Sequence, residues 1–243
     1  MRARKITHFI NKVLDIPVYL ALLFSLFLGV YSIYDNYMVY KTAGDESLKR
    51  FKPGAESEEE KPTDMIAWLT LDETTIDYPV MQGLNNLEYL NKDPYGEYSM
   101  SGSIFLDSRN APDFSDDYSL IYGHHMEHTM FGAIDFFLDK TYYEKHRTGT
   151  LTVGNKTYRL KTFAVVEALA EEDKIFNFKE GTLEYIKENA KIINKEDMPN
   201  GRYIGMSTCK FPDTTERTIL FAVLEEESNT VRDSDTISGD LND

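Results

Sequence analysis

Short apolar runs separated by turn residues fill the middle of the chain. From Met65 onward, eight runs are rich in β-branched and aromatic residues, at 65–71, 75–81, 101–107, 117–123, 149–155, 156–169, 202–209 and 217–224. Runs of this length and composition, bounded by Gly, Pro, Asn and Asp, predict β-strands. So many short strands in one domain predict either a barrel or a sandwich.

Three segments between these runs have helical patterning. Residues 85–91 are short, 129–139 show 3.6-like spacing behind a threonine, and 179–195 form a longer amphipathic stretch. Apolar residues at this spacing place one face of a helix against a core. We therefore expect a mainly β domain with peripheral helices.

The N-terminal region has a different pattern. From Ile16 to Tyr34 there are 19 residues without a charge. At about 1.5 Å per residue they reach roughly 28 Å, close to the thickness of a bilayer's hydrocarbon core. A cleaved signal peptide would end at small residues, whereas this segment continues into the bulky sequence YSIYDNYMVY. The pattern predicts an uncleaved membrane anchor.

The flanking charges predict how this anchor is oriented. Four basic residues and one acidic residue precede it, so the N-terminus is expected in the cytoplasm and the rest of the chain outside the cell. The expected organisation is a cytoplasmic N-terminus (1–15), a single transmembrane anchor (16–34), an extracellular helix and linker (35–64), a β-rich domain (65–226) and an acidic disordered tail (227–243). The net charge of −15 disfavours binding to nucleic acid.

Cys209 is the only cysteine of the chain. Cysteines outside the cytoplasm are usually paired, and a lone one cannot form an internal disulfide. It is therefore an inert buried thiol, an intermolecular link or a reactive group. Its partners in the sequence decide between these alternatives.

A histidine cluster, YGHHMEH, follows the run 117–123 where the chain leaves the predicted sheet. His124, His125 and His128 are polar loop residues, or His124 and His128 are zinc ligands, or one histidine activates Cys209. The zinc reading needs a glutamate directly after the first histidine, and that place holds His125. An imidazole near Cys209 would favour the thiolate, and Arg217, at the start of the next run, would supply a permanent cation for an oxyanion.

These residues resemble a known family. YGHHM with MFGAI, and MSTC followed by an arginine that opens the next strand, are similar to the sortases, which are membrane-anchored cysteine transpeptidases. The segments LDETTIDYPVMQG, NNLEYLN and SGSIFLDSRN resemble the early strands of class B members. KEGTLEYIKENAKI is similar to their insertion before the cysteine strand.

The resemblance implies a closed eight-stranded β-barrel and assigns roles to individual residues. His124 matches the catalytic histidine, Cys209 the nucleophile and Arg217 the essential arginine. Residues expected along a substrate groove are Asn86, Leu90, Tyr185, Ile186, Ser207 and Thr208.

The implied substrates are exported proteins with a C-terminal sorting signal, and the acceptor is an amine of peptidoglycan or of a pilin. No metal or organic cofactor is implied. The alternative from a different class is a metal-dependent surface hydrolase that uses His124 and His128.

Overall fold

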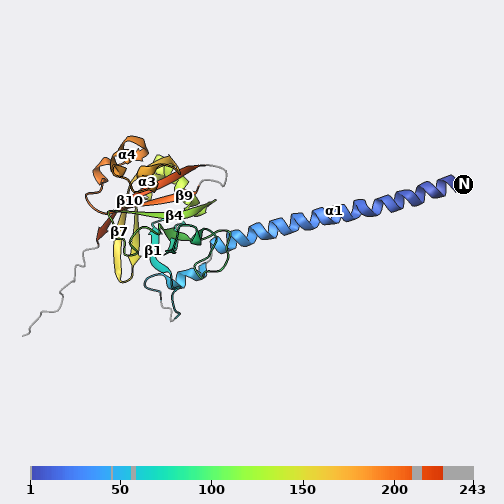
Figure 1. The fold of residues 1–243 in the computed structure, drawn as a ribbon, viewed down its shortest axis with the longest axis horizontal. Coiled ribbons are helices and arrows are strands. Elements are labelled where there is room, and N and C mark those ends of the chain that lie inside the picture. The colour runs from blue at the N-terminus through green and yellow to red at the C-terminus, as the bar shows by residue number, and fades with distance from the viewer. Residues whose placement is uncertain (1, 45, 56–58, 210–214, 227–243) are drawn as a thin grey trace, which may run out of the picture.

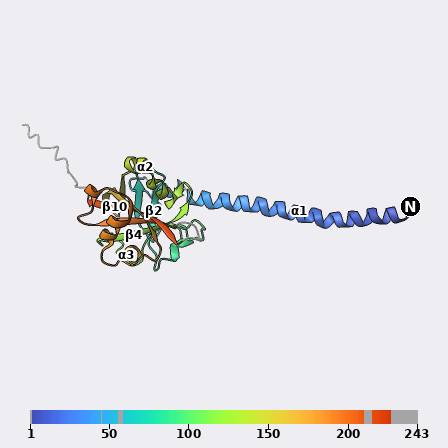
Figure 2. The same ribbon diagram turned by 90° about the horizontal axis from the view of Figure 1, so that it is seen from above.

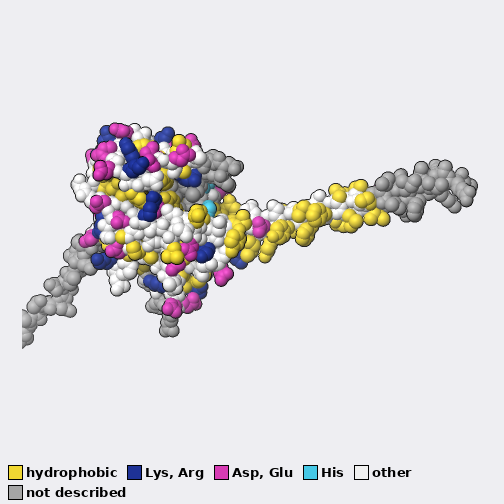
Figure 3. Space-filling model, in the orientation of Figure 1, with side chains coloured by type: hydrophobic (Ala, Val, Ile, Leu, Met, Phe, Trp, Pro, Cys, Tyr) yellow, Lys and Arg dark blue, Asp and Glu magenta, His cyan; other side chains and the backbone are white. Residues whose placement is uncertain are grey.

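The computed structural model describes residues 2–44, 46–55, 59–209 and 215–226, and it shows a β-barrel from which one long helix projects (Figure 1). This helix is α1 (Arg2–Ala43), and its apolar side chains are exposed from Ile16 to Tyr34 (Figure 3). Within the described part of the chain, it is the one helix long and apolar enough to cross a membrane. The helix continues past the predicted anchor without a break as far as Ala43.

Eight strands form the barrel, and each overlaps one predicted apolar run. They are β1 (Met65–Leu71), β2 (Asp77–Met81), β3 (Ile104–Leu106), β4 (Tyr118–Met126), β6 (Thr148–Val153), β7 (Lys156–Leu169), β9 (Tyr203–Cys209) and β10 (Glu216–Glu226). Their order around the barrel is β10-β9-β4-β3-β2-β1-β6-β7, and β7 pairs with β10 to close it. The predicted closed eight-stranded barrel is confirmed.

Two short strands lie outside this ring. β5 (Thr129–Met130) pairs with the end of β4, and β8 (Ala190–Ile193) pairs with β7. The sequence pattern placed both of them in helical segments. In the second case the amphipathic stretch starts as a helix but ends as an edge strand.

The helical segments surround the barrel, as predicted. They are η1 (Glu46–Phe51), η2 (Glu88–Leu90), η3 (Phe131–Leu138), α2 (Lys140–Lys145), α3 (Asp173–Phe176), α4 (Thr182–Asn189) and η4 (Lys195–Asp197). Elements α2 and α3 lie on opposite sides of the barrel (Figure 2). Because inward side chains alternate along each strand, the interior fills with large apolar residues, of which Leu69, Leu160 and Leu220 are fully buried. On the outer face of the sheet, Leu120 and Phe163 are buried in a second cluster that includes side chains of α3 and α4.

The barrel core extends to the end of α1. Ala43 is 4% exposed and belongs to the same buried cluster as Met126 and Met130, while Val39 packs against that cluster. After α1, Leu48 and Phe51 of η1 cover Trp68 on β1. The helix and the barrel are therefore joined by packed side chains as well as by the chain itself.

Candidate active site

Strands β4 and β9 bring the histidine cluster beside the cysteine. They run parallel, with Tyr122 paired to Ser207 and His124 paired to Cys209. Neighbouring positions in a parallel pair lie about 4.8 Å apart. Pairing of these strands therefore brings the backbones of His124 and Cys209, which are far apart in the sequence, side by side.

Strand β10 brings the arginine to the same end of the sheet. It runs antiparallel to β9, with Ile219 opposite Ser207. Arg217 lies two residues before Ile219 and Cys209 lies two residues after Ser207, so both lie at this end of the strand pair. The Arg217 side chain is half-buried and its Nη1 donates a hydrogen bond to the carbonyl of Glu216 at 3.0 Å. His124, Cys209 and Arg217 thus lie at the same end of three adjacent strands, and we call them the row of three.

The His124 ring is held by the backbone of another segment. Its Nε2 lies 2.7 Å from the carbonyl oxygen of Leu90, the last residue of η2. The side chain is half-buried, and a Cβ placed on Gly102 would lie 2.9 Å from its Cδ2 atom. The ring is therefore fixed from the side of the β2–β3 connection.

The other two histidines of the cluster have separate surroundings. His125 Nε2 lies 2.8 Å from Asp135 Oδ2 on η3. His128 has a 67% exposed side chain, which stacks on Phe136. Because β4 continues through Met126, His124 and His128 do not have the geometry of helical i, i+4 ligands. No group of three His, Cys, Asp or Glu side chains suited to a metal is found among the described residues.

The residues predicted for a substrate groove fall into two groups. Leu90 packs beside the buried Tyr89, and Ser207 and Thr208 are fully buried on β9 next to the row of three. The hydroxyls of Ser207 and Thr208 have no hydrogen-bond partner within the described part of the chain.

The second group lies on α4 and on the β2–β3 connection. On α4, Ile186 is fully buried in an apolar cluster, and the partly buried Tyr185 and Tyr122 both pack against that cluster. Asn86 has a clear structural role. Its amide donates to Asp107 Oδ2 at 2.8 Å and its oxygen accepts the N–H of Ser108 at 2.7 Å.

Asp107 is the centre of a polar network that the sequence analysis did not identify. Its side chain is fully buried and accepts hydrogen bonds from Arg109 Nε at 2.8 Å and from Tyr122 Oη at 3.0 Å, in addition to Asn86. Burial opposes the charged carboxylate, but the hydrogen bonds from Arg109 outweigh it and hold the pKa of Asp107 below its usual value.

Arg109 extends this network to the insertion before β9. Its Nη2 donates to the carbonyl of Phe176 at 2.6 Å, and its guanidinium lies 4.6 Å from the centre of the Phe178 ring. The network therefore ties three connections of the barrel to Tyr122, two residues before His124. We call Asn86, Asp107, Arg109 and Tyr122 the Asp107 clip. Its one signal in the sequence is the pair of charges in LDSRN after a strand.

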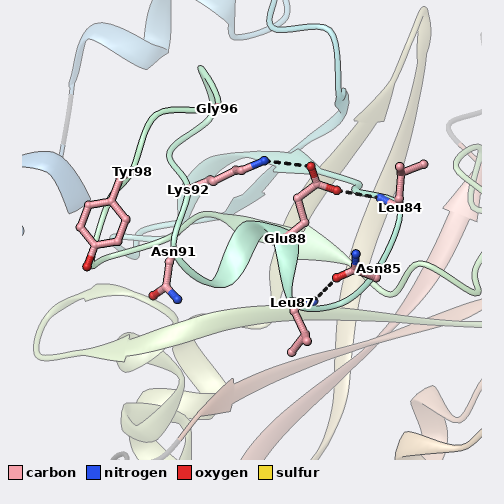
Figure 4. A pocket seen from close by; sticks show the side chains of 8 residues that line it. All are labelled: Leu84, Asn85, Leu87, Glu88, Asn91, Lys92, Gly96 and Tyr98. Carbon is pink, nitrogen blue, oxygen red and sulfur yellow. Dashed lines mark hydrogen bonds and ion pairs between the residues drawn. The ribbon is translucent and has the colours of Figure 1, made fainter.

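A shallow hollow lies on the surface of the β2–β3 connection (Figure 4). Glu88 stands in its wall and accepts hydrogen bonds from Lys92 Nζ and from the N–H of Leu84, both at 3.0 Å. Leu84 and Leu87 are 95% and 74% exposed at its rim. The hydrogen bonds of Glu88 fix the path of the chain that leads to Leu90.

Comparisons with known proteins identify relatives of this chain. Sortase B of Staphylococcus aureus is 30% identical over 181 residues, which cover 70% of this chain and 74% of the relative. Sortase B of Listeria monocytogenes is 35% identical over 159 residues, covering 60% of this chain and 63% of the relative. No family model matches the chain.

Solved structures show the same fold. A class B sortase of Streptococcus pyogenes, described as involved in pilus biogenesis, matches with a TM-score of 0.62 and 39% identity, covering 67% of this chain and 92% of that one. The substrate complex of Staphylococcus aureus sortase B matches with a TM-score of 0.60 and 28% identity, covering 75% and 85%. Together with the barrel fold, these similarities show that the chain belongs to the class B sortases, and thus to the cysteine transpeptidases.

Proposed function

We propose that this sortase cleaves the sorting signal of an exported protein through a thioester on Cys209 and transfers the acyl group to an amine. The placement of His124, Cys209 and Arg217 at one end of three adjacent strands carries the proposal. It supplies a nucleophile, an acid–base group and a permanent cation at one end of the barrel, which is the set that acyl transfer needs.

In the first half-reaction, the Cys209 thiolate attacks the scissile carbonyl carbon and a carbon–sulfur bond forms. The guanidinium of Arg217 stabilises the oxyanion of the tetrahedral intermediate. The His124 imidazolium then gives its proton to the departing amine, and the carbon–nitrogen bond breaks. The products are a thioester on Cys209, a neutral His124 and the released C-terminal peptide.

In the second half-reaction, the acceptor amine attacks the thioester. His124 takes the proton that the amine loses, an amide bond forms, and the thiolate of Cys209 leaves. Water reaching the thioester would give hydrolysis instead. The chemistry admits an amine of peptidoglycan or a pilin lysine, and the pilus relative makes the second an acceptor worth testing.

We also propose that α1 is a single transmembrane anchor with its N-terminus in the cytoplasm. Its exposed apolar surface and the basic residues before it support this orientation. An anchored enzyme would meet membrane-bound substrates in two dimensions at the cell surface.

A peptide panel tests the proposed chemistry. The enzyme is incubated with sorting-signal peptides, with and without a peptidoglycan-type amine or a pilin-type lysine peptide, and analysed by mass spectrometry. We expect an acyl adduct on Cys209, an amide product that depends on the added amine, and no activity for Cys209→Ala. A chelator should change nothing. Turnover that survives Cys209→Ala or is abolished by the chelator would contradict the proposal.

A further inference from the structure

Residues 89–92 present four successive backbone carbonyls, and each is bound by a specific donor. The carbonyl of Tyr89 accepts the N–H of Ser103 at 3.0 Å, and that of Lys92 accepts the Ser103 hydroxyl at 2.7 Å. The carbonyl of residue 91 accepts the N–H of residue 99 at 3.0 Å. The remaining one, at Leu90, is bound by His124 Nε2 at 2.7 Å. With the imidazole bound to Leu90, all four carbonyls of residues 89–92 accept a hydrogen bond.

This contact determines which ring nitrogen carries hydrogen. A carbonyl oxygen has no hydrogen to give, so His124 Nε2 must be the donor in this bond. In the neutral ring, Nδ1 then holds the lone pair, and in the imidazolium both nitrogens are protonated. Gain and loss of a proton therefore take place at Nδ1, while Nε2–H stays bound to Leu90.

Gly102 makes this arrangement sterically feasible. Its φ of +58° lies in the left-handed region, and an added Cβ would lie 2.4 Å from the Leu90 oxygen, 2.7 Å from the Tyr89 oxygen and 2.9 Å from His124 Cδ2. The Tyr89 oxygen is fixed by its bond to Ser103. A side chain at residue 102 would therefore displace the Leu90 carbonyl, the imidazole or both.

We infer that the Leu90 carbonyl and Gly102 form a seat that holds His124 as its Nε2–H tautomer and makes Nδ1 the nitrogen that exchanges the catalytic proton. The catalytic part of this inference rests on the proposed function. Gly102 is a positioning residue, because it acts only through His124. The signature visible in the sequence is the glycine in MSGSIFLD, which packs against a histidine 22 positions later.

Nitrogen NMR of the full chain labelled with ¹⁵N-histidine tests the seat directly. The chain has five histidines, and the His124 signals are assigned by their loss in His124→Gln. We expect the neutral His124 ring to show a protonated Nε2 and an unprotonated Nδ1. A neutral ring with hydrogen on Nδ1, or an equal mixture of tautomers, would overturn the inference without any reference to activity.

A pair of glycine variants tests the consequence for the reaction. Gly102→Ala is compared with Gly154→Ala, whose φ of +57° carries the same backbone cost but whose Cβ would have no atom within 4 Å. For Gly102→Ala we expect mixed tautomers and a kcat lowered about 10- to 100-fold, with KM changed less than about threefold. Gly154→Ala should keep the single tautomer and the wild-type kcat.

The outcomes separate the seat from the proposed chemistry. Equal kcat values for the two variants would overturn the inference. If Gly102→Ala does not fold, the wild-type spectrum still decides the tautomer. An Nε2–H tautomer in an enzyme that forms no adduct with any peptide would overturn the proposed function and leave the seat as a structural feature.

Discussion

At the scale of single residues, the proposed chemistry combines three side chains, each of which supplies what the others lack. A free thiol is largely protonated at neutral pH, so Cys209 needs a cationic neighbour to populate its thiolate. His124 is fixed at one ring nitrogen by Leu90, which leaves the other for proton transfer. Arg217 keeps its charge throughout the reaction and presents a planar set of donors.

Replacing Arg217 by lysine tests the need for this planar donor set. Lysine keeps the charge but loses the fork, so we expect kcat/KM for the peptide reaction to fall about 10²- to 10³-fold. The thermal midpoint should stay close to that of the wild type. Arg159→Lys, at an exposed position of β7, is the matched control and should have wild-type kinetics. A full rate for Arg217→Lys would mean that charge alone suffices.

At the scale of elements, the Asp107 clip explains how three connections keep their places around the site. One carboxylate accepts hydrogen bonds from Asn86, Arg109 and Tyr122, and Arg109 continues to the backbone of Phe176. A buried charge is tolerated when it is paired and fully hydrogen-bonded, as it is here. Loops without regular backbone pairing thereby acquire a defined position beside β4.

The clip predicts a specific dependence of stability on pH. Because the pKa of Asp107 is lowered in the folded protein, its contribution is present above the unfolded-state pKa of about 3.9 and is lost as pH falls through the folded value. Asp107→Asn should therefore reduce the free energy of unfolding by about 2 kcal/mol at pH 7. The difference from the wild type should shrink towards pH 3.

Urea unfolding at several pH values measures this difference. Asp72→Asn removes one negative charge at an exposed position and serves as the control. A deficit of Asp107→Asn that is the same at pH 7 and pH 3 would show that packing, and not the charge, stabilises the clip.

The strands could be predicted from the sequence, and the clip could not. Each barrel strand is a local run of β-branched and aromatic residues, so consecutive residues are enough to predict it. The strand β8 was not predicted because Ala190–Ile193 continue the amphipathic helical pattern. These residues form a strand because they pair with an edge of β7. The partners of Asp107 come from separate connections, so no local pattern indicates them.

The candidate site also combines features that a local sequence pattern indicates with features that it does not. The lone cysteine and the histidine cluster are conspicuous in the sequence, and their family resemblance indicated the class of enzyme that the comparisons confirm. The bond between His124 and Leu90 depends on a backbone carbonyl, which every residue has. Its identity therefore appears only when the register of β4 and the path of residues 89–92 are known.

At the scale of the whole molecule, the proposed topology predicts where Cys209 can be reached. It is the only cysteine, so a membrane-impermeant maleimide applied to intact cells reports on one site. We expect labelling of the wild type in intact cells and none of Cys209→Ala. A Cys209→Ala variant with a new cysteine, Thr7→Cys, should be labelled only after lysis. Labelling of Cys209 only after lysis would contradict the proposed orientation.

The joint between α1 and the barrel lies at the end of the barrel where the proposed active site is. The cavity that borders Ala43 also borders Gly102 and Met130, and a Cβ added at Gly102 would lie 2.9 Å from His124 Cδ2. If α1 spans the bilayer as proposed, the helix from Tyr34 to Ala43 sets a stand-off of roughly 14 Å between the lipid and the barrel. The enzyme would then cleave peptide bonds that lie at one height above the membrane. The same bonds held farther from the membrane by longer linkers would not be cleaved.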